Sequence, residues 1–353
     1  MFDKKRRLAA VTLLFPLMLT GCLFGPDSKS SQEIDPPPEH VQKEHAHLVN
    51  TKPQNESQAL KEKRKNGTEL YLLTETGYVV PYTIPVAKKE MDAKKVLSYL
   101  VEGGPVQSHL PQGFSAVLPK GTKVKGLHVQ AGVANVDFSR EFLNYDKKLE
   151  KKILDAVTWT LTDFDDIKAV NIWVDGKPLE AMPQGHTPAQ HLTRENGINV
   201  EVTEGVNINQ SMPVTIYFLG QNQENMVYFV PVTRMVHRQE NVAEATLKEL
   251  IKGPKQNSSL FGVIDANTEV NQVSTKGDMV TADFGEQLLQ YNSTKTASKD
   301  ALQSIVLSLT ENNSVSKVKI TVNGKNTVGV FGQKGENIDA PISRPQMINP
   351  SEL

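Results

Sequence analysis

The feature of this sequence that most constrains its fold is an internal repeat with the length of a domain. Six segments of the first half return in the same order in the second half, 146 to 150 residues later. These segments are Leu70-Tyr71-Leu72 with Ile216-Tyr217-Phe218, Tyr82-Thr83-Ile84-Pro85-Val86 with Tyr228-Phe229-Val230-Pro231-Val232, Leu97 and Leu100 with Leu247 and Leu250, Gly104-Pro105 with Gly253-Pro254, Val136-Asp137-Phe138 with Ala282-Asp283-Phe284, and Gly176-Lys177 with Gly324-Lys325. A period this long indicates two copies of one domain rather than a stack of short repeats, and each copy can bury its own core.

Hydrophobic periodicity predicts the same order of elements in both copies. In the first copy the predicted elements are strands at 70–73 and 78–84, a helix at 93–102, strands at 124–129 and 133–136, a helix at 149–163 and a strand at 169–174. Asp175-Gly176 and, in the second copy, Asn323-Gly324 are typical of tight hairpin turns. The order β-β-α-β-β-α-β-β predicts an α+β fold, a small two-layer sandwich in which each copy packs two amphipathic helices against one largely antiparallel sheet.

The chain's single cysteine follows an export signal. Basic residues at 4–7 precede an apolar run at 8–19, which is too short to cross the roughly 30 Å hydrocarbon core of a bilayer as a helix. Leu19-Thr20-Gly21-Cys22 resembles the bacterial lipobox, in which the signal is cut before the cysteine and the thiol is acylated. We therefore expect a lipoprotein anchored to membrane lipid through Cys22; an ordinary secretory signal with an incidental cysteine is the alternative.

Composition and repeat together divide the chain into six parts. Residues 22–66 are polar and lack the periodicity of a packed element, which is typical of a tether. The predicted parts are a signal peptide at 1–21, a lipidated disordered tether at 22–66, a first domain at 67–184, a linker at 185–211, a second domain at 212–334 and an irregular tail at 335–353.

Charge and motif content argue against several classes of protein. Lys and Arg total 39 and Asp and Glu total 40, so the chain lacks the basic excess of a nucleic-acid-binding protein. A single cysteine excludes disulfide-rich and Cys-ligated zinc folds. Because no phosphate-binding, metalloprotease or nucleophile motif occurs in a suitable context, we expect no catalytic residues, no cofactor and no metal site.

Asp137 and Asp283 are the best candidates for a pair of functional carboxylates, because they occupy matching positions in the two copies. An acidic residue that ends a strand before a turn usually accepts hydrogen bonds from backbone N–H groups, and this structural role is our prediction. A role in acid–base chemistry or ligand binding is the alternative.

The signal, the tether and the tandem repeat together resemble the GerM family of sporulation and spore germination lipoproteins, which have two GerMN domains. The resemblance covers the chain from Met1 to about Phe331 and rests on Cys22, on both copies of the Tyr-x-x-Pro-Val, Gly-Pro and Asp-Phe segments, and on the two Gly-Lys hairpins. It implies a non-enzymatic role in sporulation and germination on the outer face of the cell membrane. In sporulating cells that is the mother-cell or outer forespore membrane, facing the intermembrane space. GerMN domains are also similar to the ring-building motifs of secretion-type channels.

The function expected from these features is that of a membrane-tethered scaffold that assembles or positions an envelope or channel complex through protein partners. A peptidoglycan-binding module is one alternative, although the chain has only two tryptophans, Trp159 and Trp173, to stack on sugars. A cell-wall hydrolase built around Asp137 and Asp283 is another. The sequence leaves open whether the chain self-associates.

Overall fold

The structure is a computed structural model that describes residues 67–202, 207, 210–289, 296–326, 328–330 and 337–350. The predicted signal and tether, and with them Cys22, lie outside the described residues. No helix in the described part of the chain is long and apolar enough to cross a membrane.

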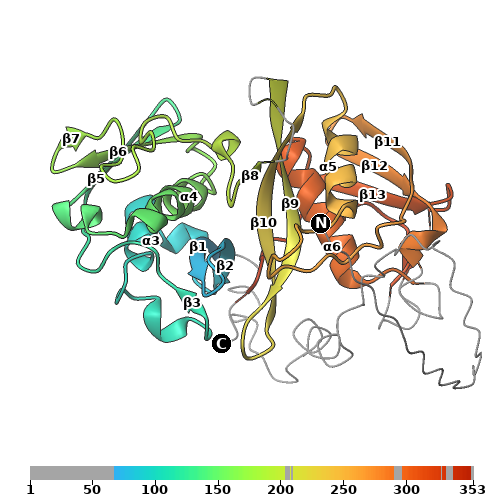
Figure 1. Cartoon of the computed structure of the whole chain (residues 1–353), viewed down its shortest axis with the longest axis horizontal. Helices are drawn as coiled ribbons and strands as arrows, with labels where there is room; N and C mark the ends of the chain where they lie inside the picture. Colours follow the sequence, from blue (N-terminus) through green and yellow to red (C-terminus); the bar gives the residue numbers. More distant parts are fainter. Residues whose placement is uncertain are drawn as a thin grey trace, which may run out of the picture. The chain divides into compact units, whose positions relative to one another are not determined.

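The order of elements predicted from periodicity is confirmed in both repeats, apart from one additional two-residue strand, β3, in the first (Figure 1). The first repeat contains β1 (Thr68–Thr74), β2 (Val79–Ile84), α3 (Ala93–Tyr99), β3 (Phe114–Ser115), β4 (Val124–Gln130), β5 (Val133–Phe138), α4 (Glu150–Leu161), β6 (Ala169–Val174) and β7 (Lys177–Pro178). The second repeat contains β9 (Ser211–Gln221), β10 (Val227–His237), α5 (Val242–Ile251), β11 (Val270–Lys276), β12 (Met279–Phe284), α6 (Lys299–Asn312), β13 (Lys317–Val322) and β14 (Val328–Gly329). Shorter strands β8 (Glu201–Val202), β15 (Asn337–Ile338) and β16 (Ile342–Ser343) follow the repeats.

The prediction of one sheet in each repeat is wrong, because each repeat has more than one. The first repeat has sheets β2-β1-β3 and β4-β5-β6-β7. The second has β8-β10-β9 and β11-β12-β13-β16, and its β14 pairs with β15 in a two-stranded sheet. Within the four-stranded sheets, β5 pairs with β6 and β12 pairs with β13 in parallel, with α4 and α6 as the crossover helices. Each of these helices contacts strands of the hairpin sheet and of the four-stranded sheet of its own repeat.

In each repeat a hydroxyl of the second helix accepts a hydrogen bond from a backbone N–H of the first hairpin. On β1, the backbone N–H of Tyr71 donates a hydrogen bond to Oγ1 of Thr160 on α4 (3.0 Å). On β9, the N–H of Tyr217 donates to Oγ of Ser308 on α6 (3.0 Å). All four residues are fully buried. A helix hydroxyl thus satisfies a buried N–H of β1 or β9 that no strand reaches at that position.

The core includes the apolar face of the predicted amphipathic helix at 149–163. Ile153, Ala156, Val157 and Leu161 on α4 are fully buried, and Trp159 on the same helix packs its ring 5.5 Å from that of Tyr71. The tight turns are confirmed as well. Their central residues have positive φ, 50° and 76° at Asp175-Gly176 and 48° and 72° at Asn323-Gly324, as Asp-Gly and Asn-Gly turns require.

The structure corrects the alignment of the first hairpin with its copy by four residues. Tyr71 pairs with Pro81, and its equivalent Tyr217 pairs with Pro231. Pro231 therefore corresponds to Pro81, not to Pro85 as the Tyr-x-x-Pro-Val match indicated. The physical reason is the greater length of the second hairpin, whose strands have 11 residues each where β1 and β2 have 7 and 6.

One buried acid fixes a loop to the start of α4 in the first repeat. Glu150 accepts hydrogen bonds from the Tyr145 hydroxyl (2.8 Å), the Gly185 N–H (2.7 Å) and the N–H and hydroxyl of Thr187 (3.1 and 2.7 Å). Burial alone would raise the pKa of Glu150, but these hydrogen bonds outweigh it and lower the pKa to about 2. The loop therefore depends on an ionised carboxylate at the helix N-terminus.

Candidate functional site

The two carboxylates singled out from the sequence hold turns. Oδ1 of Asp137 accepts a hydrogen bond from the Gly176 N–H (2.9 Å), and Oδ1 of Asp283 accepts one from the Gly324 N–H (2.8 Å). The predicted bonding to backbone N–H groups is confirmed, although the donor lies in the turn after the adjacent parallel strand rather than in the next residues of the chain. Each aspartate thus joins its strand to the hairpin turn of its own repeat.

Asp283 has further partners. It accepts hydrogen bonds from the Thr321 hydroxyl (2.5 Å) and from Nδ2 of Asn271 (3.0 Å). Burial alone would raise the pKa of Asp283, but the hydrogen bonds outweigh it and lower the pKa below its usual value. A general acid at neutral pH needs the opposite shift. Among the described residues no group of three His, Cys, Asp or Glu side chains could hold a metal ion.

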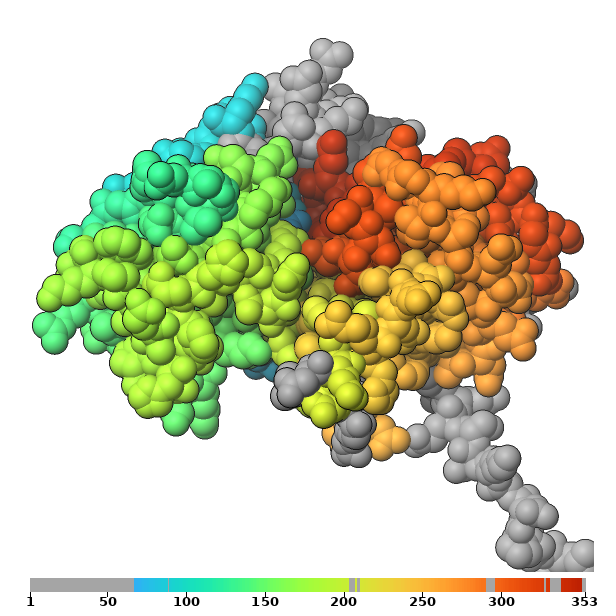
Figure 2. Space-filling view, turned by 90° about the horizontal axis from the view of Figure 1, so that it is seen from above, coloured from blue at the N-terminus to red at the C-terminus, as the bar shows by residue number. Residues whose placement is uncertain are grey.

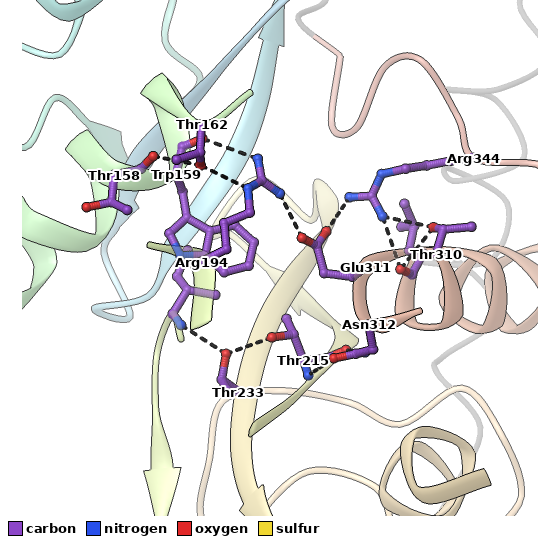
Figure 3. Close-up of polar contacts among 12 residues, drawn as sticks. Thr158, Trp159, Thr162, Arg194, Thr215, Thr233, Thr310, Glu311, Asn312 and Arg344 are labelled. Carbon is purple, nitrogen blue, oxygen red and sulfur yellow. Dashed lines mark hydrogen bonds and ion pairs between the residues drawn. The ribbon is translucent and has the colours of Figure 1, made fainter. Parts of the chain in front are cut away.

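The most extensive polar cluster lies where the two repeats meet, and sequence reasoning missed it. Glu311, near the end of α6, accepts an ion-paired hydrogen bond from Nη1 of Arg194 on one oxygen and from Nη2 of Arg344 on the other, both at 2.7 Å (Figure 3). The Tyr217 hydroxyl also donates to Glu311 (2.9 Å). Only 8% of the Glu311 side chain is exposed, so both guanidinium groups act on it in a largely water-free setting.

The two arginines occupy equivalent positions in their repeats. Arg194 donates to the Thr162 hydroxyl (3.0 Å) and to the carbonyl of Trp159 (3.3 Å) at the end of α4. Arg344 donates to the Thr310 hydroxyl (2.9 Å) and to a carbonyl of α6 at 3.1 Å. Each arginine also lies over an aromatic ring, Arg194 over Trp159 at 4.5 Å and Arg344 over Tyr217 at 5.6 Å. Each therefore caps the second helix of its own repeat before reaching the shared carboxylate.

Two acids in this cluster have pKa values shifted in opposite directions. Burial alone would raise the pKa of Glu311, but the charges of Arg344 and Arg194 outweigh it and lower the pKa to about 2. Burial raises the pKa of Glu69 on β1 to about 7, with Asp163 adding to the rise and the two arginines opposing it. Glu311 is therefore the ionised partner of both arginines, whereas Glu69 titrates near neutral pH.

A second set of contacts joins the repeats by exchanging segments. Ile198 follows the first repeat but pairs with β10 of the second, where its N–H donates to the Thr233 hydroxyl and its carbonyl accepts from the Thr233 N–H (both 2.9 Å). Ile348 follows the second repeat but pairs with β2 of the first. There its N–H donates to the Thr83 hydroxyl (3.0 Å) and its carbonyl accepts from the Thr83 N–H (3.2 Å). Each repeat thus extends the hairpin sheet of the other. In Figure 2 the dark red C-terminal part of the chain lies between the colours of the two repeats.

Two asparagines beside these isoleucines bridge β2 and β10 in the same way. Asn199 accepts from the Val79 N–H (2.9 Å) and donates through Nδ2 to the carbonyls of Val79 (2.7 Å) and Pro231 (2.8 Å). Asn349 accepts from the Phe229 N–H (2.7 Å) and donates to the carbonyls of Phe229 and Pro81 (both 2.8 Å).

The equivalence of the two asparagines extends to their backbone. Asn199 has φ 47° and Asn349 has φ 48°, in the left-handed region that asparagine tolerates better than most residues. The interface between the repeats is therefore locally two-fold symmetric.

A short motif in the sequence marks both segments. Arg194-x-x-x-Ile198-Asn199 returns as Arg344-x-x-x-Ile348-Asn349, 150 residues later. The prediction of a linker at 185–211 and an irregular tail at 335–353 places both segments outside the repeat and so hides the motif. In the structure the two segments occupy equivalent positions in the repeat. In addition, β16 pairs with β13 and so adds a strand to that sheet.

Comparison with known proteins identifies a family, a relative and a solved structure that are similar to this chain. The model of the Germane family, described as sporulation and spore germination, matches residues 69–180 and 215–328. The spore germination protein GerM of Bacillus subtilis (strain 168) is 40% identical over 360 residues, which cover 97% of this chain and 97% of that protein. The solved structure of the tandem GerMN domains of the Bacillus subtilis sporulation protein GerM is similar with a TM-score of 0.74 at 40% identity, covering 81% of this chain and 99% of that one.

Proposed function

The chain belongs to the Germane family of sporulation and spore germination proteins, and we propose that it acts there as a non-enzymatic, membrane-anchored scaffold. The scaffold assembles or positions an envelope or channel complex in sporulating cells. Cys22, acylated after removal of the signal, anchors it to the cell membrane, and the two repeats face the extracytoplasmic side. Its partners are envelope proteins rather than nucleic acid.

The observation that carries this proposal is the exchange of segments between the repeats. Because Ile198 and Ile348 each complete the sheet of the other repeat, and Glu311 pairs with an arginine from each side, the repeats form one unit. A rigid unit holds two partner-binding surfaces at a set spacing, as a scaffold requires.

The surfaces we propose for partners are the outer strands β4 and β11. Each ends its four-stranded sheet, and each leaves several side chains exposed along its length. An end strand has backbone N–H and C=O groups to which an extended segment of another protein can add. The register places Gln130 on β4 and Lys276 on β11 at equivalent positions opposite Val133 and Met279.

Site-specific photo-crosslinking in sporulating cells tests the proposal. A photoreactive amino acid replaces Gln130 or Lys276 in the full chain, and an exposed position on α4, Lys151, is the matched control. We expect discrete protein adducts from the two strand positions and none from Lys151. A further variant, Cys22→Ser, should release the protein from the membrane fraction and remove the adducts.

Two results would count against the scaffold. Adducts of equal yield from all three positions would indicate random collision, and no adducts at either strand would rule out β4 and β11 as partner surfaces. Recovery of glycan fragments instead of proteins would favour the alternative of a peptidoglycan-binding module.

A further inference from the structure

We propose that the outer face of the sheet β4-β5-β6-β7 in the first repeat binds the uncharged sugar rings of a glycan strand. The site consists of the ring of Trp173 and the side chains of Asn135 and Asp137, which the strand register places next to one another. It lies on the face of the sheet, whereas the partner surface proposed above is the end strand β4. A sugar ligand would therefore add to the scaffold role rather than replace it.

The pairing of β5 with β6 brings the three side chains to one face. Along β5 the buried residues alternate with half-buried ones, and the half-buried set includes Asn135 and Asp137. In the parallel register Asn135 lies opposite Asn171 and Asp137 lies opposite Trp173, and both of these β6 residues are half-buried as well. The alternate residues of both strands belong to the hydrophobic core, so the half-buried set faces away from it.

Trp173 is a large aromatic residue outside the core. Its neighbour Ile172 is fully buried, but among the described residues Trp173 belongs to none of the clusters that form the core. Its indole N–H is covered, and no described residue accepts a hydrogen bond from it. The part of this side chain that a ligand can meet is therefore the hydrocarbon of the ring, which suits stacking against the apolar face of a sugar.

Asn135 and Asp137 provide a fixed donor and a fixed acceptor beside that ring. Oδ1 of Asn135 accepts from Nδ2 of Asn171 (2.9 Å), and Oδ1 of Asn171 accepts from the His191 N–H (2.7 Å), which sets the orientation of both amides. Within the described part of the chain, Nδ2 of Asn135 has no acceptor. Asp137 uses Oδ1 for the Gly176 N–H, and no described residue donates to its Oδ2. An amide donor and a carboxylate acceptor next to an aromatic ring can together bind adjacent hydroxyl groups of a sugar.

A glycine leaves space next to the carboxylate. Gly126 on β4 lies opposite Asp137, and a Cβ placed on Gly126 would meet only Cβ of Asp137, at 3.9 Å. A side chain would therefore fit at this position, and the glycine is not required by close packing. Its effect is to leave Asp137 accessible from the side of β4.

The second repeat has the same sheet without these groups. Gln272, Thr281, Lys319 and Thr321 stand there at the positions of Gly126, Asn135, Asn171 and Trp173. Asp283 matches Asp137, but both of its oxygens are bonded, Oδ1 to Thr321 and Gly324 and Oδ2 to Asn271. Because the sheet forms without an aromatic ring in the second repeat, Trp173 is not needed for the fold, which points to a ligand.

The charges around the face favour an uncharged ligand. The carboxylate of Asp137 would repel a phosphate or a nucleic acid, and the ammonium group of Lys125 nearby is already paired with Asp175 (3.1 Å). For an exported chain, N-acetylated sugars of the cell wall are the glycan within reach. That source rests on the extracytoplasmic location in the proposed function, whereas the chemistry of the site does not.

Calorimetric titration of the full chain with a soluble oligomer of N-acetylglucosamine tests the site. Two substitutions introduce residues that the second repeat already accommodates at the same positions. Trp173→Thr removes the ring and Gly126→Gln fills the space beside Asp137, and each should weaken binding by about tenfold or more. Trp173→Phe, which keeps an aromatic ring, should retain most of the affinity. Lys319→Ala, on the matching face of the second repeat, is the control and should leave binding unchanged.

The absence of saturable binding by the unsubstituted chain overturns the site. Equal affinities of the unsubstituted chain, Trp173→Thr and Gly126→Gln overturn it as well. If Trp173→Thr lacks a cooperative melting transition, Gly126→Gln and Asn135→Ala decide, because both keep the indole ring.

Sedimentation with purified peptidoglycan sacculi tests the source of the glycan. We expect the unsubstituted chain to pellet with the sacculi and Trp173→Thr to stay in the supernatant. Binding to the oligomer without pelleting overturns the cell wall as the source. Because the scaffold role is tested separately, by crosslinking at Gln130 and Lys276, failure of one proposal can be distinguished from failure of the other.

Discussion

Arg194 and Arg344 bind the two oxygens of one carboxylate, each at 2.7 Å, although 150 residues separate them and each belongs to a different repeat. That carboxylate, Glu311, is supplied by the second repeat alone. One acid serves two equivalent arginines, so its loss should affect both repeats at once.

Glu311→Gln should lower the free energy of unfolding by about 3 kcal/mol, because two largely buried guanidinium groups lose their counter-charge. Chemical denaturation of the full chain measures the change. Glu244→Gln is the matched control, since the Glu244–Lys248 pair on α5 is half exposed and should contribute about 0.5 kcal/mol or less. Equal losses from both substitutions would contradict the role assigned to the cluster.

Acid should destabilise the protein in part through Glu150. The pKa of Glu150 is about 2 in the folded chain, below its value of 4.5 in a model peptide, so the folded state holds its proton less tightly than the unfolded state. The stabilisation is complete above pH 4.5 and is lost as the pH falls from there towards 2. We expect the melting temperature to fall over this range, and to fall less steeply in Glu150→Gln. If the melting temperature of Glu150→Gln depended on pH as steeply as that of the wild type, the stabilising role of the Glu150 carboxylate would be contradicted.

Glu69 should have the opposite effect on the pH dependence of stability, at higher pH. Its pKa is raised from 4.5 to about 7 by burial, so the folded state binds its proton more tightly than the unfolded state. Its contribution to stability is complete below pH 4.5 and is lost as the pH rises through 7. Glu69→Gln should therefore flatten the change in melting temperature between pH 4.5 and 7. The same slope in wild type and variant would show that Glu69 titrates normally.

Thr160→Val should destabilise the first repeat by about 1–3 kcal/mol, because the buried N–H of Tyr71 loses its acceptor. The equivalent bond in the second repeat is the internal control, since the N–H of Tyr217 donates to Ser308, which the substitution leaves unchanged. Thr160→Ser keeps the oxygen and should cost less than Thr160→Val. Hydrogen exchange at the Tyr71 amide separates the two variants. Fast exchange in both would contradict the assignment of Thr160 as the acceptor.

The element order could be predicted because apolar spacing on helices and strands is a local property. The division of each repeat into separate sheets could not, because it depends on packing between distant segments, such as the contact of Thr160 on α4 with Tyr71 on β1, residues 89 apart in the chain. The hairpin alignment failed for a different reason. Prolines occur at both Pro81 and Pro85, and only pairing across the strands decides which one matches Pro231.

The candidate site shows the same division between local and distant contacts. The backbone bonds of Asp137 and Asp283 could be expected from the turns near them. The interface between the repeats could not, since it consists of contacts between distant residues, such as Arg194 and Glu311, which are 117 residues apart. Asn199 and Asn349 are nevertheless visible in the sequence once the repeat is aligned with an offset of 150 residues.

The contact of Thr83 with Ile348 has a consequence for the order of events during synthesis. Its partners lie 265 residues apart, so the edge of β2 stays open until nearly all of the described chain has been made. Until the C-terminal segment is available, the first repeat therefore has an unpaired strand edge. The first repeat to be made is therefore the last to be completed.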